Sequence, residues 1–381
     1  MRFRFEAPAL PPQALALRGD VRAFLARQKA EGRFTPRPNC WTHYDADFTR
    51  ACGEAGFIGV TFPKDYGGHG RGALERYVVC EEMLAAGAPV GMHWIADRQS
   101  GPQILRHGSE AMRRRIVPEI VAGRCCIGIG MSEPGSGSDL ASVKTKGTKV
   151  DGGWRINGAK LWTSNAHRAH WIIALVRTEP PTAERHAGLT QLLIDMSAKG
   201  VRANPILDLA GGRDFNEVAL EDVFVPDEQV IGKPGDGWKL VTGELAYERS
   251  GPERFLSTFT LMSALIGHLG ASPEPAAKAA TGRMVAHLAT LRHMSIAVAG
   301  MLDRGESPAV EAAVVKDLGN TFEEELPEIA RLVAACESFQ GSGVNYERML
   351  ADSILAAPSF TLRGGTREIL RGIIARQLGL R

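Results

Sequence analysis

The sequence predicts an α+β fold in which a helical segment, a β-rich middle segment and a second helical segment follow one another. Apolar residues recur at three- and four-residue steps from about residue 15 to residue 123. They then alternate with polar residues or form short continuous runs as far as about Gly232, and afterwards they return to helical spacing. The chain has 381 residues, which is more than one small core needs, so two or three packing units are expected.

The first segment, 1–125, is predicted to be an all-helical domain. Gly56, Gly68 and Gly87 stand where helices should end, because glycine is a frequent helix terminator. The stretch FIGVTFPKDYGGHG is rich in glycine, and both a loop that covers a ligand and a plain connector fit it. The predicted helices are Ala14–Lys29, Asp45–Ala55, Arg71–Ala86 and Glu110–Ala122.

The middle segment, 126–233, is predicted to be a compact β-domain. Its apolar stretches are too short and too alternating for helices, and they read WRIN, KLWTS, HWIIALVR, LTQLLIDM and FNEVALEDVFV. Asp151-Gly152-Gly153 and Asn157-Gly158 contain residues that tolerate positive φ. We therefore predict a tight hairpin turn at each of these two places.

The last segment, 234–381, begins with the turn-rich stretch KPGDGW and is predicted to be a helical bundle. Its amphipathic stretches are long and contain few β-branched runs, which favours helices that pack side by side. The predicted helices are Lys239–Gly270, Glu274–Arg304, Ala309–Phe339 and Thr366–Leu378.

The composition argues against several kinds of partner and site. The chain has 45 basic and 43 acidic residues and a net charge of +2, which indicates neither nucleic acid nor a membrane as partner. No run of ~18 apolar residues predicts a membrane span, and the first residues lack the apolar core of a signal peptide, so a cytoplasmic location is expected. The six cysteines form no CxxC pair and no zinc-spaced set with histidine, which predicts buried free thiols and no metal site.

Two polar clusters within Gly128–Ser164 form the strongest candidate for a binding site. One is the glycine- and serine-rich stretch Gly135–Asp139, and the other is the run Trp162-Thr163-Ser164-Asn165. Two such clusters in β-structure predict a flat aromatic ligand held by backbone and hydroxyl groups. A nicotinamide dinucleotide site is the competing interpretation of the GxG pattern, but it needs a βαβ unit, and here the chain continues into hairpins.

Three motifs give the chain a resemblance to a known family. They read MSEPGSGSDLASVKT, DGGWRINGAKLWTSN and RGGTREILRGIIARQLG, and together they resemble the acyl-CoA dehydrogenase family over nearly the whole chain. The resemblance implies an N-terminal helical domain, a middle β-barrel domain and a C-terminal four-helix bundle. It also implies FAD, an acyl-CoA substrate, an electron-transfer flavoprotein as electron acceptor, a role in fatty acid and lipid metabolism, and a homotetramer.

The resemblance further implies a role for individual residues. Ser164 matches the position that contacts the flavin N5 region, and Ser138 matches a serine near both the pyrophosphate and the thioester, so that it serves cofactor and substrate. Thr366 opens the last predicted helix, where a threonine is a good N-cap and the helix N-terminus favours an anion. The complete cofactor-binding set carried over is Ile129, Met131, Ser132, Ser138, Trp162, Thr163, Ser164, Glu337, Gly341, Gly365, Thr366, Arg367 and Glu368.

The catalytic base departs from the common pattern of the family. Removal of hydrogen across Cα–Cβ of a thioester needs a base for the α-proton, and in many members a glutamate precedes the Gly-Thr of the last motif. Gly364 stands there in this chain. A branch that includes isovaleryl-CoA dehydrogenase carries its glutamate on the first helix after the β-domain, and Glu248 matches that position. A solvated helix glutamate beside a structural arginine is the alternative interpretation of Glu248. Arg249 is predicted to contact a coenzyme A phosphate or to fix the helix.

Two further departures keep other functions open. The stretch ASPEPAAKAATGRM lacks a recognisable arginine and Phe-Gly pair that the family uses at the cofactor's pyrophosphate, and Glu337 stands where the family often has glutamine. A second, non-identical subunit could therefore complete the FAD site in a heterotetramer. The alternatives are a flavin oxidase, a reductase or an acyl-carrier-protein enzyme of the same fold, or a non-catalytic partner subunit. His93 and His170 are interpreted as structural.

Overall fold

The computed structural model describes residues 3–180, 184–334 and 346–380, and it leaves the side chains of residues 244–248 undescribed. The described chain divides into two compact units. Unit 1 comprises Met1–Trp41, Arg71–Val90 and Ala246–Arg381, and unit 2 comprises Thr42–Gly70 and Gly91–Leu245. The predicted α+β class, with helices before and after a central sheet, is confirmed.

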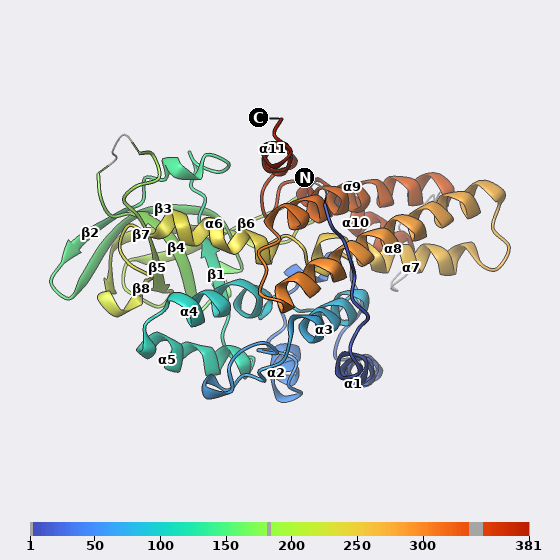
Figure 1. Cartoon of the computed structure of the whole chain (residues 1–381), viewed down its shortest axis with the longest axis horizontal. Helices are drawn as coiled ribbons and strands as arrows, with labels where there is room; N and C mark the ends of the chain where they lie inside the picture. The colour runs from blue at the N-terminus through green and yellow to red at the C-terminus, as the bar shows by residue number, and fades with distance from the viewer. Residues whose placement is uncertain (1–2, 181–183, 335–345, 381) are drawn as a thin grey trace. The chain divides into compact units, whose positions relative to one another are not determined.

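Unit 2 is built around one eight-stranded sheet, drawn in green in Figure 1. The strands run in the order β6-β7-β3-β2-β4-β5-β8, and β1 pairs with β4 in parallel. Every residue of β4 from Trp171 to Val176 is buried, whereas β7 alternates between buried and less buried positions. The strands are β1 (Ile127–Gly130), β2 (Lys146–Val150), β3 (Gly153–Ser164), β4 (Trp171–Arg177), β5 (Leu189–Asp195), β6 (Val201–Ile206), β7 (Phe215–Pro226) and β8 (Val230–Ile231).

One of the two predicted hairpin turns is wrong. The turn at Gly152 joins β2 to β3 and has φ +69°, as predicted. Asn157 and Gly158 lie instead in the middle of β3, at a shift of its register against β7. A Cβ on Gly158 would lie 2.7 Å from the Thr145 Cα, so glycine is needed there for close approach of two chain segments and not for a turn. Asn157 Oδ1 accepts a hydrogen bond from the backbone of Asp222.

Two helices of unit 2, α2 and α5, begin at residues whose side chains cap them. The Asp45 carboxylate accepts from the Phe48 N–H, and the Ser109 hydroxyl accepts from the Met112 N–H. The pattern did not predict the π-helical turn Ala96–Ser100 or α4, which are short. The helices are α2 (Ala46–Glu54), α4 (Gly101–His107) and α5 (Glu110–Val121).

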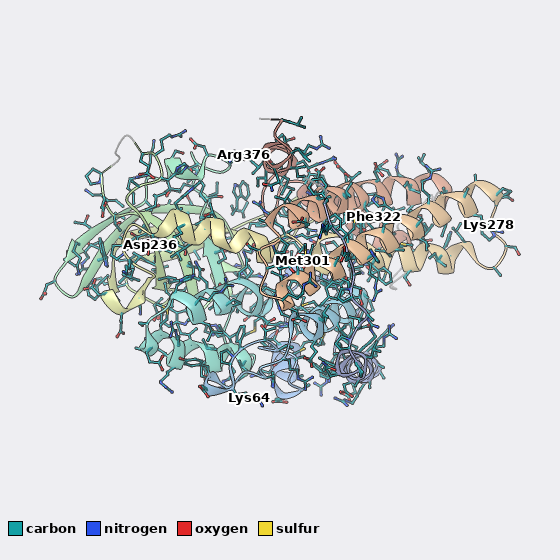
Figure 2. All side chains as sticks on the ribbon, viewed as in Figure 1. Lys64, Asp236, Lys278, Met301, Phe322 and Arg376 are labelled. Carbon is teal, nitrogen blue, oxygen red and sulfur yellow. The ribbon has the colours of Figure 1, made fainter. Side chains whose placement is uncertain are left out.

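Unit 1 is helical. A buried phenylalanine of α9, Phe322, lies among the bundle helices, while Lys278 lies at the beginning of α8 (Figure 2). Glu81 and Glu82 on α3 form ion pairs with Arg18 on α1, and Glu81 also pairs with Arg292 on α8. The helices are α1 (Pro12–Ala30), α3 (Ala73–Ala85), α7 (Phe259–Leu269), α8 (Pro275–Asp303), α9 (Ala309–Val333), α10 (Tyr346–Phe360) and α11 (Arg367–Gln377).

The single helix predicted over Lys239–Gly270 is two helices in the structure. The first is α6 (Gly237–Glu248), and a short 3-10 turn from Pro252 to Arg254 separates it from α7. Pro252 has no N–H to donate to the carbonyl of Glu248, and the residue before a proline is pushed to extended backbone. Gly251 has φ −72° and ψ 168°, as this effect requires. The proline therefore ends the helix instead of kinking it.

Among the described residues, α8 alone has the length and mean hydropathy (1.2) of a helix that could cross a membrane. It packs against α3 and α9 within unit 1. Its residues from Met294 to Gly300 are buried, which is typical of a core helix of a bundle. The five described cysteines are all buried and free, as predicted.

Candidate functional site

In unit 2 the structure brings the segment Gly128–Ser132 beside the run of β3 that contains Trp162. The carbonyl of Ser132 accepts a hydrogen bond of 2.8 Å from the Leu161 N–H. A Cβ on Gly128 would lie 3.2 Å from Thr163 Cγ2, so the absence of a side chain lets β1 approach β3. Ile129, Met131 and Ser132 therefore lie beside the run that contains Trp162 and Ser164.

Trp162 is the most unusual residue of this region. Its φ is +61°, in the left-handed region that bulky residues seldom adopt, and its side chain is 56% exposed. The register of β3 against β7 shifts between Lys160 and Thr163, which marks a bulge. The edge of the indole meets Phe215 with ring centroids 6.2 Å apart. An exposed indole on a bulge can stack against a flat aromatic group.

The hydroxyl groups predicted to serve the ligand differ in their environments. Thr163 is fully buried, and its hydroxyl has no hydrogen-bond partner in the described structure. Ser132 and Ser164 are half-buried. Ser138 is exposed and lies two residues after a turn that backbone hydrogen bonds close between Glu133 and Ser136. The predicted hydroxyl groups thus range from fully buried to exposed.

A buried ion pair that the sequence did not predict lies behind these segments. Lys160 on β3 pairs with Glu133 at 2.8 Å, and we call these two residues the barrel pair. Burial lowers the pKa of Lys160 to about 8, although Glu133 opposes this shift. Burial raises the pKa of Glu133, but the Lys160 charge and hydrogen bonds outweigh it and hold this pKa below its usual value. The spacing of Ile156 and Lys160 on one strand face was the signal that the prediction did not use.

In unit 1 the turn after α10 contains two glycines in the left-handed region. Gly364 has φ +64° and Gly365 has φ +95°. A Cβ on Gly365 would lie 3.3 Å from the Arg249 guanidinium. Arg249, predicted to bind substrate, therefore lies beside Gly365, predicted to bind the cofactor. The Gly365 carbonyl accepts a hydrogen bond of 2.9 Å from the buried Lys316 ammonium.

A second buried ion pair adjoins this turn and was also missed by the sequence analysis. Arg363 donates to Glu323 at 2.6 Å, and we call these two residues the turn pair. The guanidinium lies over the rings of Trp41 and Phe360 at 4.6 and 4.7 Å from their centroids. It also donates to the hydroxyl of Ser257. Burial lowers the pKa of Arg363 to about 10.

The other predicted residues of this region, Thr366, Arg367 and Glu368, lie at the start of α11. Thr366 occupies the N-cap position of α11 as predicted, but its side chain makes no capping hydrogen bond to the helix backbone. The pKa of Glu368 is lowered by hydrogen bonds from the Glu368 backbone and from the Thr366 side chain. Arg367 donates to Asp317 at 3.1 Å and to Thr321 at 2.9 Å, so its guanidinium is held on α9.

Three predicted residues lie outside what the structure describes. Glu248 is the last residue of α6, and its side chain is among those left undescribed. Glu337 and Gly341 lie outside the described residues altogether. Their assigned roles stay predictions.

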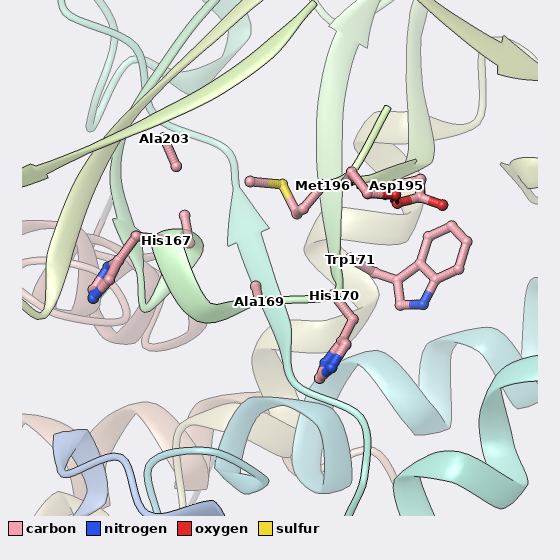
Figure 3. A pocket seen from close by; sticks show the side chains of 9 residues that line it. His167, Ala169, His170, Trp171, Asp195, Met196 and Ala203 are labelled. Atoms are coloured by element: carbon pink, nitrogen blue, oxygen red, sulfur yellow. Dashed lines mark hydrogen bonds between the residues drawn. The ribbon is translucent and has the colours of Figure 1, made fainter. Parts of the chain in front are cut away.

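A cavity of about 540 Å³ opens in unit 2 at the end of the sheet (Figure 3), and its described lining residues include none of the predicted cofactor residues. His167, Trp171 and Met196 are among its lining residues. The ring of His170, which also lines it, accepts a hydrogen bond of 3.0 Å from the Cys126 N–H. The other histidine of interest, His93, is buried 3.0 Å from the Thr49 hydroxyl, and burial lowers its pKa to about 3. Both histidines thus have the structural partners that were expected of them.

Comparison with known families assigns most of the chain. Residues 11–124 match the acyl-CoA dehydrogenase N-terminal domain, residues 128–223 match the middle domain, and residues 270–379 match the C-terminal domain. The chain is 34% identical over 342 residues to the acyl-CoA dehydrogenase IpdE1 of Mycobacterium tuberculosis, which covers 86% of this chain and 85% of the relative.

Other relatives agree with this match. Acyl-CoA dehydrogenase FadE34 of the same organism is 33% identical over 86% of this chain, which spans only 45% of that relative's length. A mitochondrial isovaleryl-CoA dehydrogenase of Oryza sativa is 29% identical, over 88% of this chain and 83% of the relative. Among solved structures, a chain of the ChsE4–ChsE5 complex from Mycobacterium tuberculosis has a TM-score of 0.82 at 26% identity, with 100% of both chains covered.

Proposed function

The chain belongs to the acyl-CoA dehydrogenase family, and from this premise we propose that it dehydrogenates an acyl-CoA thioester at the α,β position. FAD, which members of this family bind, supplies the hydride acceptor when it is bound. We propose further that the electrons pass to an electron-transfer flavoprotein, and that the enzyme works in the cytoplasm as a tetramer in lipid metabolism. The observation that carries the proposal is that in unit 2 the segment Ile129–Ser132 bonds to β3 at Leu161, the residue directly before the exposed indole of Trp162.

The residues of unit 2 fit a flavin by their chemistry. The Trp162 ring is exposed beside half-buried hydroxyls of Ser132 and Ser164, and the Thr163 hydroxyl is buried without a partner in the described structure. A flat heteroaromatic ring needs both a stacking surface and small hydrogen-bonding groups at its edge. In this proposal Ile129 and Met131 complete the apolar wall, and Ser138 serves the pyrophosphate or the thioester.

In unit 1 the proposal assigns proton removal to Glu248. A carboxylate is a suitable base for an α-proton when an apolar environment raises its pKa toward the working pH. Gly364 has no side chain that could take this proton. Arg249 is 4% exposed and lies beside Gly365, which supports a role in fixing that turn more than a role on an exposed phosphate. The proposal also assigns cofactor binding to the start of α11, where backbone groups of Gly365, Thr366, Arg367 and Glu368 lie. Glu337 and Gly341 are assigned to the cofactor as well.

An anaerobic titration tests this function. The purified protein is expected to be yellow and to lose its flavin absorbance when the right member of a set of straight, branched and ring-bearing acyl-CoAs is added. The Glu248→Gln variant should keep the colour and lose the bleaching. The matched control is Glu328→Gln, which removes a carboxylate from an exposed pair with Arg331 on α9 and should bleach normally. Bleaching of Glu248→Gln at the native rate would reject Glu248 as the base. Rapid reoxidation by air would point to an oxidase.

A second candidate function is that of a subunit in a mixed complex. It is favoured by Gly364, which stands where many members of the family carry the catalytic base and has no side chain. The turn that contains Gly364 is held in place by the turn pair and by Lys316. One structural neighbour is described as a complex of two proteins, ChsE4 and ChsE5. Colourless protein that fails to take up added FAD, and that turns yellow when a related chain is co-expressed, would favour this candidate over the first.

A further inference from the structure

Lys160 carries a charge into the interior of the β-domain, where the proposed function gives it no role. Its side chain is fully buried, and the Glu133 carboxylate is 8% exposed. The ammonium donates to Glu133 at 2.8 Å, to the Met131 carbonyl at 3.2 Å and to the Leu175 carbonyl. An ammonium has three protons, so all of them are used.

Glu133 is equally well satisfied. Besides Lys160, its carboxylate accepts from the backbone N–H groups of Lys144 at 2.7 Å and Thr145 at 2.9 Å. A buried charge is tolerated only when it is paired and hydrogen-bonded in this way. Because both groups are enclosed, neither can touch a substrate, and the barrel pair cannot act as a catalytic acid or base on one.

The barrel pair joins the two segments of the candidate site. Glu133 belongs to the segment that follows β1, and Lys160 stands two residues before Trp162. A second bond, from the Leu161 N–H to the Ser132 carbonyl, runs between the same segments. The Lys160 stem also fills the place of a missing side chain, since a Cβ on Gly130 would lie 3.3 Å from Lys160 Cγ.

The bulge at Trp162 needs support on both sides because its φ of +61° is unfavourable for a bulky residue. On the C-terminal side, the Asn216 amide donates to the Thr163 carbonyl at 2.9 Å, and the Asn165 N–H donates to the Asp214 carbonyl. On the N-terminal side, the barrel pair and the Leu161 bond provide the support.

We propose that Lys160 is a positioning residue, which through Glu133 fixes β3 to the segment after β1 and so holds the Trp162 bulge in the conformation that exposes its indole. This inference rests on the proposed function in one respect, namely that the indole serves FAD. The holding of the bulge itself can be measured without any cofactor.

The test compares four variants with the wild type, each as the full chain. Lys160→Met leaves the Glu133 charge buried and can fail to fold, so Lys160→Met/Glu133→Gln is made beside it. No charge remains in this double variant, and the amide oxygen introduced by Glu133→Gln can still accept from the Thr145 N–H. The first control is Lys149→Met, which removes an exposed pair with Asp227 from the same domain. The second control is Leu192→Ala, which destabilises the sheet core without touching the barrel pair.

Hydrogen–deuterium exchange gives the readout that does not depend on flavin. For each folded protein, exchange of a peptide covering residues 159–164 is divided by exchange of a peptide from α5, because β4 itself bonds Lys160 and pairs with Leu192. In the double variant this ratio should rise about tenfold or more, because the Leu161 N–H loses its support, while both controls keep the native ratio. A native ratio in the double variant would overturn the proposal, as would an equal rise in Leu192→Ala.

FAD affinity separates this inference from the proposed function. If the wild-type chain binds FAD, the double variant should bind it at least tenfold more weakly, and Lys149→Met should bind it normally. Unchanged affinity in the double variant would overturn the positioning role. If the wild-type chain takes up no FAD under any condition, the proposed function fails, while the exchange ratio still decides whether the barrel pair holds the bulge.

Discussion

The β-domain of unit 2 and the turn after α10 in unit 1 each place left-handed backbone next to a buried ion pair, but with different residues. Next to the barrel pair the residue is Trp162, with φ +61°. Next to the turn pair the residues are Gly364 and Gly365, with φ +64° and +95°. Left-handed backbone costs about 1–2 kcal/mol for a residue with a Cβ and almost nothing for glycine.

The difference teaches what each pair does. The barrel pair holds a conformation that Trp162 itself opposes, and the result is an aromatic side chain that is 56% exposed. The turn pair surrounds a backbone that glycine adopts freely, and no side chain is presented at Gly364. What is fixed there is backbone, because the Gly365 carbonyl accepts from Lys316. Loss of the turn pair should therefore reduce stability above all, whereas loss of the barrel pair should also release a bulge.

The largest effect is expected when one member of the turn pair is removed. Arg363→Met leaves the fully buried Glu323 carboxylate without its guanidinium partner, which typically costs about 3–5 kcal/mol. The midpoint of urea unfolding, followed by helical circular dichroism, should fall accordingly. Arg331→Met removes an exposed ion pair from the same helix, α9, and should cost less than about 1 kcal/mol. Equal losses in the two variants would show that the turn pair adds nothing beyond a surface contact.

The next effect distinguishes the two pairs by pH. The pKa of Lys160 is lowered to about 8 by burial, whereas lysine in an unfolded chain titrates near 10.4. Between these values the unfolded chain binds the extra proton, so the free energy of unfolding rises with pH, and this contribution is lost as the pH falls through 8. From pH 8 to 9.5 the rise is on the order of 2 kcal/mol.

The control for this pH effect is the Lys160→Met/Glu133→Gln variant, which lacks the titrating group. The pKa of Arg363 is lowered only to about 10, so the turn pair contributes little over the same interval. Urea unfolding of the wild type and the double variant at several pH values between 8 and 9.5 should therefore give a steeper rise for the wild type. Identical slopes would contradict a titration of Lys160 in this range.

The same comparison explains how much of the molecule could be predicted from its sequence. Periodicity located α1, α2, α3, α5 and α8 and most strands, because each buries one continuous face. It placed a turn at Gly158 because a glycine after asparagine usually signals one, and the contact with Thr145 that requires this glycine is not local. It continued one helix past Pro252 because the apolar spacing persists on both sides of the break.

The candidate site was predictable where its chemistry lies in a short motif. The motifs located Ser132 and Trp162, and the structure brings their segments together. They did not reveal either buried pair, because the partners are 27 residues apart in one pair and 40 apart in the other. A lone lysine in a strand looks like a surface residue until its neighbours in space are known. The left-handed φ of Trp162 was equally hidden, because no residue preference predicts a tryptophan there.

A smaller effect is expected from adding a methyl group to the glycine turn. Gly365→Ala forces a Cβ into left-handed backbone and to 3.3 Å from the Arg249 guanidinium, so a loss of about 2 kcal/mol is expected. Gly305→Ala has a similar φ, +75°, with nothing within 4 Å of the new Cβ, and should lose about 1 kcal/mol. The difference between their urea midpoints measures how firmly Arg249 is held. If Gly365→Ala loses no more than Gly305→Ala, Arg249 moves aside freely and does not fix the turn.

The smallest change in stability is expected when the two regions are made alike by Trp162→Gly. Glycine relieves about 1–2 kcal/mol of left-handed strain. Against this stand the lost edge contact with Phe215, worth about 0.5–1.5 kcal/mol, and the lost burial of the covered part of an indole that is 56% exposed. Gain and loss largely offset each other, so the free energy of unfolding should change by less than about 1 kcal/mol, while FAD affinity should fall at least tenfold. The control is Trp162→Phe, which keeps the strain and a ring and should retain more of the affinity. A Trp162→Gly protein that binds FAD as the wild type does would mean that the strain at residue 162 serves something other than the flavin.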